Sequence, residues 1–218
     1  MTALVDSSSS QFGNSGTSIT WSHTCSGLDR AIIVSVFTNA AGQTATSVTY
    51  GGIAMTLIGG TSGTDSRIEQ WKLSNPAKGA NNVVISWPAS AHSAAGAVSF
   101  TGAHNTTSQL TGTQTTNTGV GSSSTVDVSA TSTQIILDCV GHAVYPDVTI
   151  VSAGAGQTSR FNIGGSLGAG VTNSTIAGST KAGAATVTMT WTFSGSAGGW
   201  RALAVPIKPS SGSMLVAL

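Results

Sequence analysis

The sequence predicts an all-β protein: an antiparallel β-sandwich, jelly-roll-like, with roughly 10–12 strands and almost no helix. Two observations predict this class. Apolar and polar residues alternate with a period of two along most of the 218 residues, and no long stretch keeps the 3.6-residue period of a helix. Gly, Ser, Asn or Pro residues bound these runs at the spacing typical of sandwiches and barrels. We expect one domain over residues 17–209, between an N-terminal arm (1–16) and a C-terminal arm (210–218).

Two runs are apolar on both faces. In AIIVSVF (residues 31–37) and in QIILDCV (residues 134–140), apolar residues occupy odd and even positions alike. A strand that is apolar on both faces lies centrally in a sheet, or has one face covered by a neighbouring subunit. We therefore expect both runs to be buried strands.

A glycine pair, Gly51-Gly52, separates two alternating runs in SVTYGGIAMTL. Val48 and Tyr50 share a face before the pair, and Ile53 and Met55 share a face after it. This pattern predicts a β-hairpin, because primed two-residue turns need positive φ. A phosphate-binding loop would need GxxxxGK[ST], or GxGxxG at the start of a helix, and this stretch has neither.

Other runs are apolar on one face only. NVVISW (residues 82–87) places Val83, Ile85 and Trp87 together, and Pro88 ends it. ATVTMTWTF (residues 185–193) alternates apolar residues with threonines, which predicts a half-buried strand with a threonine-covered outer face. Between them, TGTQTTNTGVGSSS (residues 111–124) is predicted to be a long surface connection. A division of the chain into two sub-repeats there is the less favoured alternative.

The charge balance excludes several classes of partner. Only 7% of the residues are charged, with 8 basic and 7 acidic residues, so we expect neither nucleic acid nor an anionic membrane as a partner. The first residues lack the basic and apolar regions of a signal peptide, and no segment approaches the ~20 apolar residues of a spanning helix. We expect synthesis in a host cytoplasm.

Catalytic and metal-binding patterns are weak. The four histidines lie far apart, and neither cysteine has a zinc-ligand spacing. Cys25 and Cys139 are predicted to be half-buried thiols, with one disulfide as the open alternative. Glu69 and Asp138 are predicted to be salt-bridged or edge carboxylates rather than a glycosidase pair. GGSLG around Ser166 matches GxSxG, but no helix is predicted after it. We therefore expect no enzyme, no cofactor and no metal.

Aromatic residues offer a candidate glycan platform, because exposed rings stack on sugar faces. Trp87 and Trp191 share faces with aliphatic residues and are predicted to be core. Trp71, Tyr145 and Trp200 are the candidate exposed aromatics, with packing or a subunit interface as the alternative.

A resemblance covers residues 17–209. The ordered series SVTYGGIAMTL, WKLSNPAKGANNVVISW, AVSFTGA, GAGQTSRF and MTWTFSGSAGGWRALAVPIKP resembles β-sandwich modules of bacteriophage virion proteins and of secreted bacterial surface proteins. These motifs are strand and turn patterns, so they specify a fold better than a function. The resemblance implies no catalytic residue.

The resemblance, taken with the expected lack of a signal peptide, a second module and an anchor, implies a virion protein. The expected function is capsid decoration or cementing. The alternative is a carbohydrate-binding or adhesion module of a tail fibre or cell-surface protein. Expected partners are copies of the chain in a homotrimer, other virion proteins such as the major capsid protein, and, under the alternative, surface glycans. Apolar residues beside Ser-rich spacers are the candidate docking arms: Leu4, Val5, Met214, Leu215, Val216 and Leu218.

Overall fold

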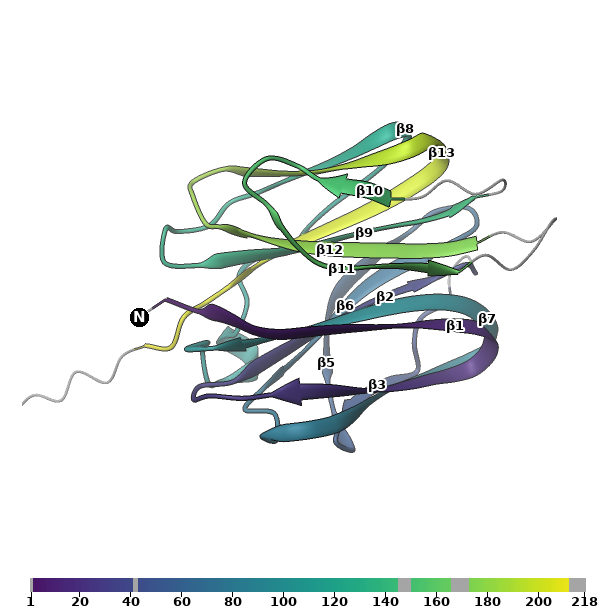
Figure 1. The fold of residues 1–218 in the computed structure, drawn as a ribbon. Helices are drawn as coiled ribbons and strands as arrows, with labels where there is room; N and C mark the ends of the chain where they lie inside the picture. Colours follow the sequence, from purple (N-terminus) through teal and green to yellow (C-terminus); the bar gives the residue numbers. More distant parts are fainter. Residues whose placement is uncertain (1, 41–42, 145–149, 166–172, 212–218) are drawn as a thin grey trace, which may run out of the picture.

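The computed structural model describes residues 2–40, 43–144, 150–165 and 173–211. Within these ranges, thirteen strands form two antiparallel sheets, and the helical element is one 3-10 turn, η1 (Thr107–Gln109). The all-β prediction is confirmed. Figure 1 shows the two sheets as stacked layers, with the purple-to-blue strands below and the green-to-yellow strands above. This arrangement is consistent with a sandwich or barrel-like fold.

The first sheet contains seven strands from the first half of the chain. Its hydrogen-bonded order is β4-β3-β7-β2-β6-β5, and β1 pairs with β7 outside this path. The strands are β1 (Leu4–Cys25), β2 (Ala31–Thr38), β3 (Ser47–Tyr50), β4 (Ile53–Ala54), β5 (Thr56–Ser62), β6 (Arg67–Ser74) and β7 (Gly79–Thr101).

The second sheet contains six strands from the second half. Its order is β10-β13-β9-β12-β11, and β8 pairs with β13 outside this path. The strands are β8 (Thr115–Val128), β9 (Ile135–Val144), β10 (Ile150–Ala153), β11 (Thr158–Gly165), β12 (Asn173–Ala182) and β13 (Val187–Ile207).

The two sheets follow one strand plan. The path β3-β7-β2-β6-β5 of the first sheet corresponds to β10-β13-β9-β12-β11 of the second, and β1 on β7 corresponds to β8 on β13. The structure thus favours the sub-repeat alternative. Residues 111–124, expected to be a surface connection, belong mostly to β8. Only the last part of β8 is buried, at Ser124, Val126 and Val128, so the Gly- and Thr-rich start shows little apolar alternation.

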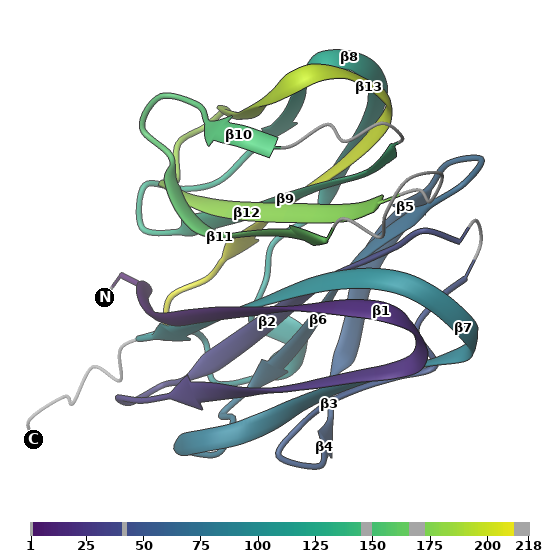
Figure 2. The same ribbon diagram turned by 45° about the vertical axis from the view of Figure 1, so that its right-hand side comes forward.

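The longest strands bend back over their own sheets. The first half of β1 pairs with the second half of β7 (Leu4 with Thr101), and its second half pairs with the start of β7 (Cys25 with Gly79). Register shifts between Gly13 and Ser18 mark the bend, because bulges increase the bending and twist of a strand. Figure 2 shows both strands turning back together, and β8 and β13 curving in the same way above them.

The N-terminal segment differs from its prediction. Residues 4–16, expected to be an arm, form the first half of β1. Backbone pairing with β7 satisfies the polar groups of this Ser-rich run, and Val5 packs against the core between the sheets. Leu4 is 62% exposed and stays available for contact with another molecule.

Three apolar clusters hold the fold together. One lies between the sheets and joins Ile33, Phe37 and Phe100 to Leu137 and Val205. The other two lie inside the bent sheets. The central runs are buried as predicted, including all eight residues of β2. Trp87 and Trp191 are core residues, also as predicted, at 4% and 2% exposure.

Part of the contact between the sheets is reciprocal. Strands β11 and β12 of the second sheet contact β7, and their counterparts β5 and β6 contact β13. Such reciprocity is the property of an isologous, two-fold interface. Phe37 lies against Gly141, where an added Cβ would be 2.3 Å from the ring, and Phe161 lies against Gly96, where it would be 2.5 Å away. The match is partial, because β1 also contacts β11, and the described residues show no contact of similar extent between the counterparts β8 and β5.

The Gly51-Gly52 turn is confirmed. Tyr50 pairs with Ile53 across it, and the two glycines have φ of +57° and +81°, the positive values that a type I′ turn needs.

Candidate functional site

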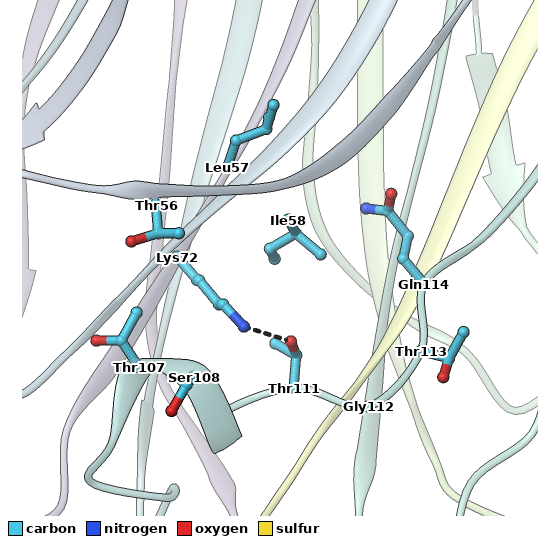
Figure 3. Close-up of a pocket in the computed structure, with 10 residues that line it drawn as sticks. All are labelled: Thr56, Leu57, Ile58, Lys72, Thr107, Ser108, Thr111, Gly112, Thr113 and Gln114. Carbon is cyan, nitrogen blue, oxygen red and sulfur yellow. Dashed lines mark hydrogen bonds between the residues drawn. The ribbon is translucent and has the colours of Figure 1, made fainter.

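A pocket of about 520 Å³ lies where the segment between the two sheets crosses β5 and β6. Figure 3 shows the Lys72 side chain reaching toward Thr111, with Gln114 at one end of the pocket and Thr107 and Ser108 at the other. Ten residues line it: Thr56, Leu57, Ile58, Lys72, Thr107, Ser108, Thr111, Gly112, Thr113 and Gln114.

Lys72 supplies the charge of the pocket. It is half-buried in β6, and its Nζ donates a hydrogen bond to Thr111 Oγ1 at 2.9 Å. The ion pairs within the described ranges are Arg67–Glu69 and Arg201–Asp65, so Lys72 has no carboxylate partner there. Burial, and secondarily the nearby charge of Lys208, lower the pKa of Lys72. An ammonium group has three protons, so its donor capacity exceeds the one bond to Thr111.

Hydrogen bonds fix the frame of the pocket. Thr107 Oγ1 and Ser74 Oγ are 2.7 Å apart, which ties η1 to the end of β6. Gln114 Nε2 donates to Oε1 of buried Gln70 at 2.9 Å. A Cβ at Gly59 would lie 2.5 Å from Gln114 Oε1, so this glycine allows the amide to approach β5. The lining is consequently held in place by contacts from both strands.

The lining combines charge, hydroxyl groups and an aliphatic wall. None of its ten described residues is acidic, and five of them, Thr56, Thr107, Ser108, Thr111 and Thr113, carry hydroxyls. Leu57, 37% exposed, and Ile58 supply the apolar surface. A lining of this composition can pair with a negative charge, exchange hydrogen bonds with polar groups and contact an apolar surface.

A second hollow of about 300 Å³ lies between the turn after β5 and the bends of β8 and β13. Arg201, which is 5% exposed, lines it and pairs through Nη2 with Asp65 Oδ1 at 3.2 Å. Because this charge is already paired, the hollow is a weaker candidate for an ionic ligand than the Lys72 pocket.

The expected aromatic platform is corrected by the structure. Trp71 is 9% exposed, lies in the core of the first sheet and donates from Nε1 to Glu69 Oε2 at 3.1 Å. Trp200 is 5% exposed and lies against Gly119 in the core of the second sheet. Both rings are covered because each sheet folds over its own face. Tyr145 lies outside the described residues.

Of the candidate docking residues, only Leu4 and Val5 lie within the described ranges. Leu4 is exposed and Val5 is partly buried. Met214, Leu215, Val216 and Leu218 lie outside the described residues, as does Ser166 of the GxSxG match.

The two mid-strand carboxylates lie in different sheets. Glu69, 2% exposed, pairs with Arg67 Nε at 2.5 Å, which confirms the salt-bridge prediction for this residue. Asp138 is 1% exposed and belongs to a central strand, so it is neither salt-bridged in the described part of the chain nor at an edge. Its oxygens accept hydrogen bonds from Ser179 and Trp191 instead.

Cys25 and Cys139 are free thiols, and both are fully buried rather than half-buried. They belong to different apolar clusters, so the disulfide alternative is excluded in this structure. Burial raises the pKa of both thiols. Within the described ranges, no group of three or more His, Cys, Asp or Glu residues is placed to hold a metal ion.

The residues of the Lys72 pocket were not predicted from the sequence. Lys72 stands in an ordinary strand, RIEQWKLS, and its partner Thr111 is 39 residues away. The sequence gives one local signal of the pocket. Lys72 lies between Trp71 and Leu73, and no acidic residue of this strand shares its face.

Comparisons with known proteins identify no relative. No protein-family model matches the chain, and no curated protein or solved structure matches it significantly. Among the described residues, no helix is long and apolar enough to cross a membrane. The fold alone therefore defines the structural class, which is an all-β protein of two antiparallel sheets with the same strand plan.

Proposed function

We propose that this protein is a non-enzymatic structural component of a bacteriophage particle, located on the virion as a capsid decoration or cement protein. The observation that carries the proposal is the pairing of two equivalent β-sheets around a shared apolar core. The resemblance of its strand and turn motifs to virion modules supports the same function. We also propose that the sandwich is jelly-roll-like.

The physical properties of the surface suit a coat subunit. Only 7% of the residues are charged, so copies can approach one another with little electrostatic repulsion. Among the residues that the structure describes, four large apolar side chains are more than half exposed, namely Leu4, Leu28, Ile53 and Val120. Scattered apolar residues of this kind can bury against neighbouring subunits. We propose a homotrimer that contacts other virion proteins such as the major capsid protein.

Immunogold electron microscopy on producing cells and their lysate tests the proposal. Gold spread over icosahedral heads is the expected result. Particles without gold, with the antigen elsewhere, would overturn the virion function.

The proposed docking arms have a separate test. Particles are assembled with a chain that lacks residues 212–218, and with a second chain in which exposed Leu4 is replaced by Ser. We expect fewer copies per particle in each case, measured by quantitative mass spectrometry. Unchanged copy numbers would remove the docking function from these residues.

The second candidate is a glycan-binding or adhesion module. The Lys72 pocket favours it, rather than the buried tryptophans, because five hydroxyls and an ammonium group line an open cavity. Gold at tail tips or on cell walls would favour this candidate over capsid decoration.

A further inference from the structure

We propose that the Lys72 pocket binds the carboxylate group of an acidic sugar, such as a hexuronic acid unit of a polysaccharide. This inference rests on the pocket alone and holds whether or not the protein decorates a capsid.

The charge of the pocket indicates an anion. Lys72 has one described side-chain hydrogen-bond acceptor, Thr111, and no carboxylate partner in the described part of the chain. Lys208 adds a second positive charge nearby. A half-buried ammonium group has lost part of its hydration, and the interaction with a carboxylate is stronger there than in bulk water. The attraction of a bound anion would therefore offset both the desolvation of Lys72 and its repulsion by Lys208.

The remaining lining indicates a sugar. Ile58 lies between Lys72 and Gln114 and offers an aliphatic surface on which the C–H face of a pyranose ring can pack. Thr56, Ser108 and Gln114 present hydroxyl and amide groups that can both donate and accept hydrogen bonds, as sugar hydroxyls do. A volume of about 520 Å³ lies in the range of small-ligand pockets, so one or two rings fit.

The chemistry favours a carboxylate. The described lining contains a lysine but no arginine, and η1 has only three residues, so neither a guanidinium fork nor a helix terminus is present for a phosphate. A sulfate ester would offer a similar charge, and the experiment includes one for this reason.

The test is calorimetric titration of the full-length protein with digalacturonic acid. Its dimethyl ester is the matched ligand control, because it keeps the shape and hydroxyls and removes the charge. We expect saturable binding of the acid, weakened by added salt, and binding of the ester weaker by about tenfold or more. A sulfated neutral disaccharide should bind more weakly than the acid.

The matched variants are Lys72→Met and Lys78→Met. Lys78 lies exposed in the turn before β7, outside the pocket. The first variant should lose about tenfold or more in affinity, and the second should bind as the wild type does. Thermal unfolding establishes that both variants are folded. The proposal is overturned if the acid does not bind at millimolar concentration, if ester or sulfate binds as well as the acid, or if Lys72→Met keeps full affinity.

Discussion

Replacing Asp138 by asparagine should change the stability of the protein in a pH-dependent way. Asp138 lies in the core of the second sheet with 1% exposure. Its Oδ1 accepts hydrogen bonds from Ser179 N at 2.8 Å and Ser179 Oγ at 2.6 Å, and its Oδ2 accepts one from Trp191 Nε1 at 2.8 Å. Burial raises the pKa of this carboxyl to about 7, although the three donors oppose the rise.

The direction and size of the change in the free energy of unfolding with pH follow from proton linkage. Between pH 3.8 and about 7, the folded protein holds a proton on Asp138 that the unfolded chain has released. The free energy of unfolding therefore falls as pH rises, by about 1.4 kcal/mol per pH unit and roughly 4 kcal/mol over the window. Asparagine does not titrate, so the variant lacks this contribution. Its Nδ2 would also face the Trp191 N–H donor, which costs about 1–3 kcal/mol at every pH.

Urea denaturation of both proteins at several pH values from 4 to 8 measures this effect. The quantity to follow is the free energy of unfolding of the wild type minus that of the variant, which should fall by roughly 4 kcal/mol from pH 4 to pH 7.5. The subtraction is needed because burial lowers the pKa of His23 and His142 to about 4, so both histidines destabilise the fold as pH falls from 6.5. A difference that stays constant with pH would refute the reasoning.

Three further predictions concern packing, the hairpin and the thiols. Gly141→Ala should lower the free energy of unfolding by about 1–3 kcal/mol, measured in urea, because its methyl group would overlap Phe37 across the two sheets; an unchanged midpoint would contradict this packing. Gly52→Ala should cost about 1–2 kcal/mol through its φ of +81° alone, since nothing lies within 4 Å, and Gly52→Asn should cost less in the same assay. Cys25 and Cys139 should react with a thiol reagent only in denaturant, and rapid labelling of the native protein would show that they are accessible.

Short-range patterns predicted the parts of the fold that local chemistry determines. The two-sided apolar runs became the central strands β2 and β9, and the glycine pair became a hairpin turn. Pairing between distant segments determines the rest. The first half of β1 is rich in Ser, and its register is set by β7, with Leu4 opposite Thr101. The start of β8 is similarly polar and pairs with β13. Such strands carry little alternation of their own, so the sequence suggested an arm and a loop.

The candidate site depends even more on distant contacts. Whether a tryptophan on a strand is exposed depends on which sheet folds over it, and alternation alone does not show this for Trp71 or Trp200. The pocket brings β5 and β6 together with residues 107–114, so its lysine has no neighbour in sequence that would mark it. From sequence alone, a lysine such as Lys72 looks like an ordinary surface residue, and only the contact with residues 107–114 distinguishes it.

The position of the pocket follows from how the duplicated plan is connected. The two sheets follow one strand plan, and part of the contact between them is reciprocal. The segment that leads from β7 to β8 must nevertheless cross one sheet, and it is anchored over the first by Ser74–Thr107, Lys72–Thr111 and Gln70–Gln114. This segment occurs once in the chain, so the pocket that it lines has no symmetric copy on the second sheet. The segment that breaks the symmetry therefore contributes Thr107, Thr111 and Gln114 to a pocket that lies on the first sheet alone.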